Sequence, residues 1–266
     1  MEPMLVVRNL RFAIDESVPK HWHGRGRAVS IYFDGLSLFF PEGERFFVSS
    51  VRAHEKHLSQ ELALEAKRFA AQEGIHGREH DGYNAHLARH GYPSARLERK
   101  VKDLLRFARR SLPRRWQLGI TCALEHFTGM MALILLGDPR NLQGSHPTMR
   151  ELWRWHAAEE SEHKTVPFDV FRAAGGTEFE RIATMLIATA FFWAKVLQHQ
   201  VVMMRADGCL WSLAEWHSLA RYHFVDPGGM RTIAWTWLQY FKSGFHPSDL
   251  DDGALLDAWR EEYAVR

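Results

Sequence analysis

Residues 155–164 read WHAAEESEHK and place three carboxylates and two imidazoles within eight residues. His156, Glu160 and His163 are spaced i, i+4 and i+7, so on a helix that turns by about 100° per residue they share one face. Glu159 and Glu162 flank that face. Acidic helices with an occasional histidine are common on protein surfaces, so this stretch alone fits either a solvated helix or a metal-binding face.

A second stretch, QEGIHGREH at residues 72–80, contains the same residue types. Glu73 and His76 are spaced i, i+3, and His80 follows one turn further along the same face. A Glu-x-x-His pair therefore occurs on two separate helices. Each pair offers a carboxylate and an imidazole to one point beside its helix.

Two single carboxylates lie in apolar segments. Glu125 lies within ITCALEHFTGMMALILL, where mostly small residues are its neighbours at helical spacing, and Glu44 lies within FFPEGERFFVSSV among phenylalanine and valine. Burying an unpaired charge costs several kcal/mol, and a bound cation removes that cost. Both carboxylates are therefore candidate metal ligands.

The order along the chain is Glu, Glu-x-x-His, Glu, Glu-x-x-His, the pattern of a carboxylate-bridged dimetal site in a four-helix bundle. We therefore predict two bound metal ions. The predicted ligands are Glu44, Glu73, His76, Glu125, His156, Glu160 and His163. Oxygen-rich ligation with imidazole favours iron, with manganese and zinc as alternatives. His156 is a nitrogen donor beyond the usual six residues, so it would make the two metal positions unequal.

Other histidines and acids are expected to lie outside the ligand set. His80 is expected to support a ligand or face the substrate, with simple solvation as the alternative. His126 follows Glu125 and cannot share its helix face, so we expect it to be packed or to support a ligand. Glu159 is a further candidate for a supporting role. Four histidines in polar surroundings are expected to be exposed: His54, His57, His86 and His90.

Helical periodicity dominates the chain, and long alternating strand patterns are missing from the sequence. We predict an all-α fold, a ferritin-like four-helix bundle with additional C-terminal helices. It is expected to form a single domain over residues 1–266. The expected parts are an N-terminal arm (1–29), a metal-binding bundle (30–178) and a helical extension (179–266).

The expected helices have boundaries set by proline, glycine and capping residues. A first helix is expected to break or bend at Pro41 and Gly43. The later ones are residues 59–80 followed by a turn-rich segment to 94, then 96–113, 116–136, 148–174 with a kink at Pro167, and 179–206.

Composition limits the classes of function. The formal charge of +2 gives no global indication of nucleic-acid binding. Cys122 and Cys209 are the only cysteines, which supports neither a disulfide framework nor a cysteine zinc site and fits a reducing cytoplasm. The first twenty residues lack a secretory signal pattern. The apolar stretches 118–136 and 182–194 are expected to be buried helices, because a membrane span needs about 20 apolar residues.

Residues 96–115 form a basic amphipathic segment. Such a helix can lie on an anionic membrane, meet an acidic partner, or form the solvated face of a bundle. The C-terminal extension is expected to cover the site or to mediate a homodimer.

The stretches FPEGERFF, QEGIHGREH, LEHFTG and WHAAEESEHK together resemble the bacterial family labelled predicted metal-dependent hydrolase, over roughly residues 22–174. The ligand pattern also resembles that of ferritin-like di-iron N-oxygenases acting on aryl amines, whose last ligand helix carries His-x-x-x-Glu-x-x-His. That motif maps onto His156, Glu160 and His163, with Glu44, Glu73, His76 and Glu125 completing the set. Little similarity extends beyond these positions, so a shared substrate is not implied.

Three functions follow as hypotheses. The first is a di-iron oxidoreductase that uses O2 and an electron donor to oxidise a small organic substrate. The second is a metal-dependent hydrolase that uses a metal-bridged water. The third is an iron-oxidising or iron-binding protein, or a helical interaction protein without catalysis.

Overall fold

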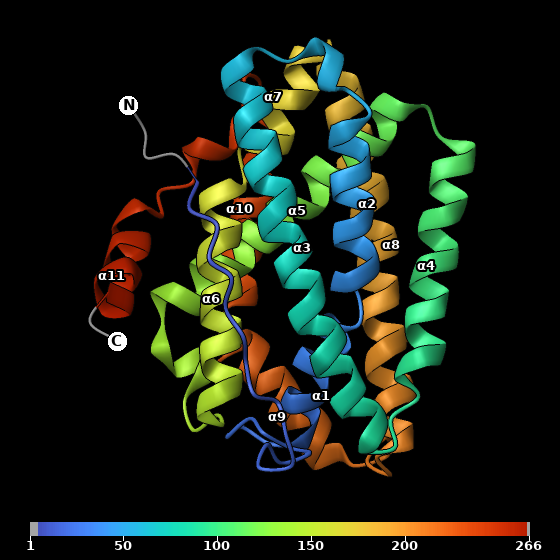
Figure 1. Cartoon of the computed structure of the whole chain (residues 1–266). Coiled ribbons are helices and arrows are strands. Elements are labelled where there is room, and N and C mark those ends of the chain that lie inside the picture. Colours follow the sequence, from blue (N-terminus) through green and yellow to red (C-terminus); the bar gives the residue numbers. More distant parts are fainter. Residues whose placement is uncertain (1–4, 265–266) are drawn as a thin grey trace.

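The computed structural model describes residues 5–264, which fold into helices and contain no strand (Figure 1). The α-helices are α1 (Arg27–Ser37), α2 (Phe40–Arg52), α3 (Gln60–Arg89), α4 (Ser94–Ser111), α5 (Arg114–Gly137), α6 (Pro147–His163), α7 (Val166–Ala173), α8 (Glu178–Ala206), α9 (Leu213–Phe224), α10 (Met230–Gln239) and α11 (Gly253–Ala264). Three short 3-10 helices are Glu55–His57, Pro139–Leu142 and Pro247–Asp249. The predicted all-α class is confirmed.

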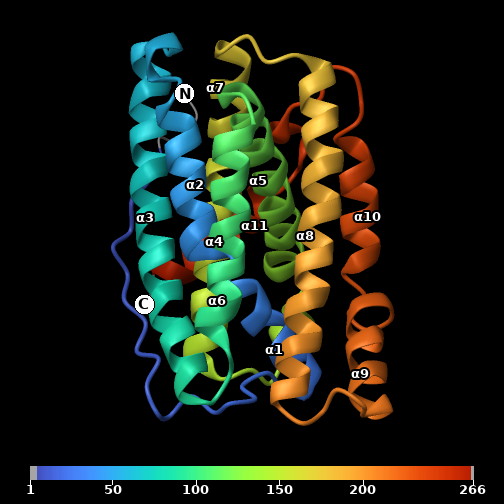
Figure 2. The same cartoon turned by 90° about the vertical axis from the view of Figure 1, so that its right-hand side faces the viewer.

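The helices that carry the predicted ligands are α2, α3, α5 and α6. Within this group α2 packs on α3 and α5, and α5 packs on α6. Helix α8 packs on α5 and α1, while α4 lies against α2 (Figure 2). The relation to ferritin-like bundles and the boundaries at residues 29 and 178 stay predictions, although helix α1 already begins at Arg27.

Helix beginnings follow local signals in the sequence. Pro41 lies in the first turn of α2, where its missing N–H costs nothing, so the chain breaks before it and Gly43 lies inside the helix. The Ser59 hydroxyl accepts a hydrogen bond from Leu62 N at 3.2 Å and begins α3. A reciprocal pair of bonds between Thr177 and Glu180 begins α8.

Helix α3 extends nine residues beyond the predicted end at His80, and the predicted turn-rich segment from residue 81 is wrong. Tertiary contacts outweigh the weak helix propensity of Gly82 and Asn84. The Asn84 amide donates to Glu98 Oε1 at 2.8 Å, which ties α3 to α4. The turn itself is confined to residues 90–93, where Gly91 has a φ of +82° that favours glycine.

The predicted helix 148–174 divides into α6 and α7, close to the kink that was predicted at Pro167. Pro167 lies in the first turn of α7. At the break the Lys164 side chain is buried, donates to Leu250 O at 3.3 Å and forms an ion pair with Asp252. The end of α6 is therefore fixed by the segment that leads into α11.

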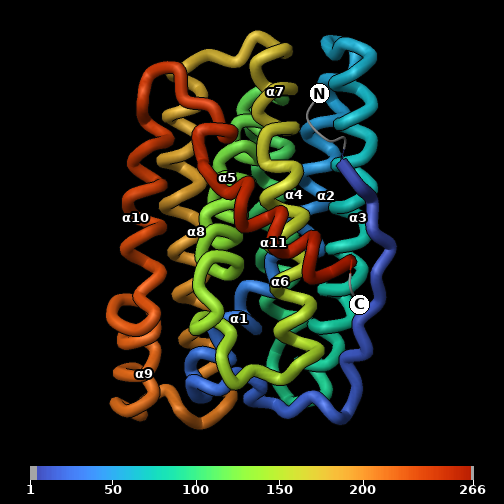
Figure 3. Tube along the Cα trace, turned by 90° about the vertical axis from the view of Figure 1, so that its left-hand side faces the viewer, coloured from blue at the N-terminus to red at the C-terminus, as the bar shows by residue number. Residues whose placement is uncertain are grey.

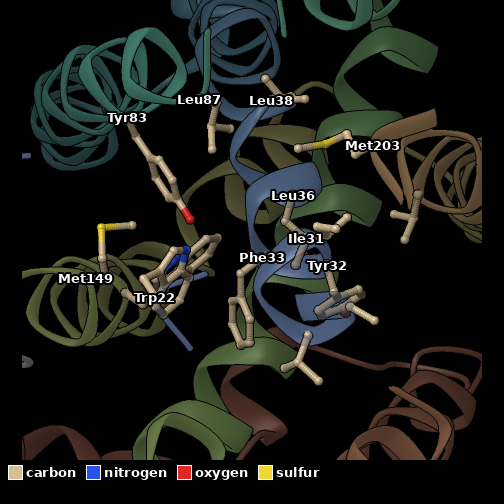
Figure 4. Close-up of a cluster of buried hydrophobic side chains, with 14 of the residues drawn as sticks. Trp22, Ile31, Tyr32, Phe33, Leu36, Leu38, Tyr83, Leu87, Met149 and Met203 are labelled. Atoms are coloured by element: carbon tan, nitrogen blue, oxygen red, sulfur yellow. The ribbon is translucent and has the colours of Figure 1, made fainter. Parts of the chain in front are cut away.

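A large apolar cluster holds one end of the molecule together (Figure 4). Trp22 from the N-terminal arm packs edge-on against Phe33 of α1, with 5.6 Å between ring centroids. Trp22 Nε1 and the Tyr83 hydroxyl both donate to Asp34 Oδ1, at 2.9 Å and 2.6 Å. The arm is therefore part of the core at this end.

Two helices are long and apolar enough to cross a membrane, judged by length and composition alone. In the most apolar window of α5, 72% of residues are buried, which agrees with the expectation of a core helix. In α8 only 28% are buried, so the expectation of a buried helix is wrong there. The outward face of α8 exposes Phe179, Leu186 and Phe191, because described residues pack mainly on its other face.

Two of the four histidines expected to be exposed are buried instead, namely His54 and His86. The His54 ring contacts Ser50 O through Nδ1 at 2.9 Å, and the His86 ring lies against His90, with 4.4 Å between centroids. Both histidines lie in polar surroundings in the sequence, but the fold shields their side chains from solvent.

The two ends of the described chain lie on the same side of the molecule. Figure 3 shows the N-terminal arm running beside α3, and α11 crossing α6. Helix α11 packs on α5 and α6. Both segments therefore cover the helices that carry the predicted ligands.

Candidate metal centre

The structure brings all seven predicted ligands into one buried cluster. They come from α2 (Glu44), α3 (Glu73, His76), α5 (Glu125) and α6 (His156, Glu160, His163), and each exposes at most 2% of its surface. They form three overlapping groups in which the possible ligand atoms lie within 4.8 Å of one another. Four helices thus converge on one small volume.

Glu160 lies beside imidazoles from two of the three donor groups. One group is Glu44, His76 and His156, another is Glu73, Glu125 and His163, and the third combines Glu160 with Glu73 and His76. Glu160 Oε1 lies 2.8 Å from His156 Nε2, while Glu160 Oε2 lies 3.4 Å from His163 Nε2. Donors at right angles, each about 2.1 Å from a shared ion, lie about 3 Å apart. These spacings fit two cations with Glu160 between them.

Many polar atoms of the cluster have no hydrogen-bond partner within the described chain. The unpartnered buried atoms are both carboxylate oxygens of Glu44, Glu73 and Glu125, with Glu160 Oε2, His76 Nδ1 and His163 Nε2. A buried polar atom without a partner costs about 1–3 kcal/mol. Because these atoms point into the same cluster, bound cations would satisfy them together.

The charges of the cluster also favour bound cations. Burial and the neighbouring carboxylates raise the pKa of Glu44 and Glu125 well above the usual range, and burial raises the pKa of Glu73 to about 7. Against the effect of burial, the carboxylates of Glu160 and Glu125 raise the pKa of His163. A proton on His163 would offset part of the carboxylate charge where no cation is bound. Two divalent ions would balance four ionised carboxylates and leave the imidazoles neutral.

Hydrogen bonds outside the cluster set the orientation of His156. The Ser37 hydroxyl donates to Asn84 Oδ1 at 2.7 Å, so it accepts from His80 Nδ1 at 2.8 Å. His80 Nε2 then accepts from His156 Nδ1 at 2.7 Å. This chain leaves the lone pair of His156 Nε2 directed at Glu160, the arrangement expected for a metal ligand.

The other two imidazoles are held in the same way. His76 Nε2 donates to Glu159 Oε2 at 3.0 Å, and His163 Nδ1 donates to Gln72 Oε1 at 3.0 Å. Arg8 of the N-terminal arm pairs with Glu159 at 3.2 Å. Each imidazole is therefore anchored through one nitrogen and presents the other to the carboxylates.

Residues 6–251 match the model of the family described as predicted metal-dependent hydrolase. The chain belongs to this family. No curated protein and no solved structure matches the chain. The family match covers every residue of the buried cluster, and its description agrees with metal dependence.

In this member of the predicted metal-dependent hydrolases, His80 contacts His156 and Glu159 contacts His76. The supporting roles expected for His80 and Glu159 stay predictions. His126 lies elsewhere, packed against Tyr240 with 4.8 Å between ring centroids and with Nε2 3.3 Å from Thr236 O.

Two supporting residues were missed by sequence reasoning, Gln72 and Arg8. Gln72 directly precedes Glu73 and lies one helical turn before His76, a signal that could have found it. Arg8 lies in an irregular segment that carries no such signal.

Two hollows lie beside the centre of this family member, while the carboxylate oxygens of Glu44 and Glu73 are themselves buried. A cleft of about 600 Å³ between α2 and α3 is lined by Glu44 and Glu73 and carries Arg45, Arg78 and Asp81. On the other side, a small hollow touches His156 and Glu160 and is bounded by Phe40, Thr128 and Met131. The surroundings of the centre are thus polar on one side and mainly apolar on the other.

Proposed function

We propose that this protein binds two iron ions at the seven clustered residues and uses them to oxidise a small organic molecule with O2. Bound ferrous ions would supply electrons for the reduction of O2, and an external electron donor would restore them. Four carboxylates and three imidazoles form an oxygen-rich donor set that suits iron. The position of Glu160 between two groups of donors is the observation that carries the proposal.

The residues of the chain have distinct tasks in this proposal. His76, His156 and His163 are fixed in orientation by partners outside the cluster, so they are preorganised as neutral ligands. Phe40 and Met131 border the hollow at the centre and limit the entry of water. Apolar walls beside the centre suit O2 and an organic substrate better than they suit a hydrolytic water.

The proposal is tested with protein loaded with Fe(II) without air and then exposed to O2. We expect O2 consumption and a change in the visible absorption spectrum. Glu73→Gln should lose both, because Glu73 belongs to two of the three donor groups. Glu61→Gln, an exposed site on the same helix, is the matched control and should behave as wild type. Iron-loaded wild-type protein that consumes no O2 and shows no spectral change would contradict the proposal.

Hydrolysis is the second candidate, and the family description favours it. Bound metals lower the pKa of a coordinated water and orient it toward an ester, amide or phosphate. The polar cleft lined by Glu44 and Glu73 places solvent beside the buried carboxylates of the centre. Turnover of such substrates by Zn(II)-loaded or Mn(II)-loaded protein without O2, together with no O2 uptake by the Fe(II) form, would place hydrolysis first.

A further inference from the structure

An apolar cavity lies beside the metal centre, between α2, α4, α5 and α8. Its volume is about 220 Å³, and its lining is apolar except for Thr128 and Lys195. The Thr128 hydroxyl donates to Glu125 O of its own helix at 2.9 Å. In another protein, an apolar cavity of about 150 Å³ binds benzene. This cavity is therefore large enough for an apolar ligand.

The cavity is elongated along the helices. Its lining extends along α4 from Val101 to Leu112, the residue directly after the helix, which corresponds to about 16 Å at the helical rise of about 1.5 Å per residue. Phe107 of α4 and Phe191 of α8 line it and are also exposed by 66% and 53%. The cavity thus reaches the surface between α4 and α8, and its shape suits an extended chain better than a compact ring.

Lys195 provides the single charged group in the lining. It is the last residue of α8 to line the cavity, and Leu36 and Phe39 line it as well. Its Nζ donates to Gln198 Oε1 at 3.0 Å and forms no ion pair with any residue between 5 and 264. A half-buried lysine side chain without a carboxylate partner, beside an apolar cavity, is suited to bind an anionic head group.

The cavity and the metal centre are neighbours. Phe40, Thr128 and Met131 line the cavity and also bound the hollow that touches His156 and Glu160. Glu125 precedes Thr128 by one turn of α5, and Glu44 follows Phe40 by one turn of α2. A ligand in the cavity would therefore lie next to the carboxylates.

We propose that this cavity binds the aliphatic chain of a monocarboxylate, with Lys195 pairing with the carboxylate. The assignment of this ligand as the substrate rests on the proposed oxidation at the metal centre. The binding itself does not, because the cavity is formed by residues outside the seven-residue cluster. Medium-length fatty acids such as decanoate have the required chemistry.

The proposal is tested by titrating metal-loaded protein, kept without air, with decanoate and with decanol in a calorimeter. We expect decanoate to bind about tenfold more tightly than decanol, the effect of one charge-assisted hydrogen bond. Lys195→Gln should remove this preference without affecting decanol, and Lys195→Arg should restore it. Equal binding of the two ligands, or binding of neither, would overturn the proposal.

A second variant tests the place of binding. Ala108 lines the cavity from α4, so Ala108→Trp should fill it and weaken decanoate binding at least about tenfold. Arg110→Trp adds the same side chain at an exposed site on the same helix and should leave binding unchanged. Unchanged binding in a folded Ala108→Trp protein, shown by its circular dichroism, would contradict the assignment.

The two proposals fail separately. Decanoate binding without O2 uptake by the Fe(II) form would preserve the fatty-acid site and contradict the oxidation. O2 uptake without decanoate binding would do the reverse. If both are correct, decanoate should change the rate of O2 uptake in wild-type protein, and Ala108→Trp should lose this response while keeping its metal.

Discussion

Gly77 is the point at which α3 leaves room for the Glu44 carboxylate. A methyl group added at Gly77 would lie 2.8 Å from Glu44 Oε2, closer than van der Waals contact allows. Gly77→Ala should therefore displace Glu44 and lower the metal content, although alanine favours a helix by about 0.5–1 kcal/mol over glycine. Metal analysis of the purified variant checks this expectation.

Gly82 provides a matched control on the same helix, because an added methyl group meets no atom of the described chain within 4 Å. Gly82→Ala should raise the unfolding temperature slightly and leave the metal content unchanged. A Gly77→Ala protein with wild-type metal content would show that Glu44 is not needed as a ligand.

The seven clustered residues could be predicted because helical spacing is a local property. His156, Glu160 and His163 share a face on any helix, so these three side chains could be grouped without knowledge of the fold. The orientation of each imidazole could not be predicted in this way. It depends on partners that come from other helices or turns, such as His80 for His156.

At the scale of elements, His126 links α5 to α10. A substitution at His126 tests whether this residue belongs to the metal centre. Burial lowers its pKa from 6.5 to about 4, so the folded protein favours the neutral imidazole. Its contribution to stability is present above pH 6.5 and is lost as the pH falls toward 4. His126→Phe should remove this loss.

Between pH 7 and pH 5, the free energy of unfolding should fall for both proteins. We expect the fall to be smaller for His126→Phe than for wild type, with a difference of up to about 2 kcal/mol. Urea denaturation at both pH values measures the difference. The metal content at pH 7 should not change, because the His126 ring packs on Tyr240 rather than on the cluster. Loss of metal in this variant would assign His126 a supporting role at the centre.

Helix boundaries were predictable where a single residue sets them. Ser59 and Pro167 mark the first turns of α3 and α7, and the structure agrees at both. The end of α3 was not predictable, because Asn84 continues the helix only through its contacts with α1 and α4. Propensity alone favours a turn there.

At the scale of the whole molecule, Arg8 connects the N-terminal arm with α6. Its guanidinium, 10% exposed, pairs with Glu159 at 3.2 Å and with Glu162 at 2.8 Å. Arg8→Ala leaves two buried carboxylates without this partner and should lower the free energy of unfolding by about 2–4 kcal/mol. Chemical denaturation measures the loss.

Arg11 gives the matched control, because it is 71% exposed and lies 3.8 Å from Glu79. Arg11→Ala should change stability by less than about 1 kcal/mol. Equal stability of Arg8→Ala and wild type would mean that the arm does not hold α6 in place.

Features that require the complete packing were beyond sequence analysis. The arm has no periodicity that would place Arg8 beside Glu159. The apolar cavity exists only where four helices meet, and α8 reads as a buried helix although one of its faces is exposed. The basic helix α4 was expected at the surface or on a membrane, and it also forms one wall of that cavity.

The most direct test of the metal centre is the amount of iron that the protein binds. Purified protein without an affinity tag is loaded with Fe(II) without air, freed of loose metal and analysed by mass spectrometry. We predict about two ions per chain for wild type and Glu61→Gln, as expected for a dimetal bundle site, and a clear loss for Glu73→Gln. Equal iron content in Glu73→Gln and wild type, or no retained metal in wild type, would contradict a dimetal centre.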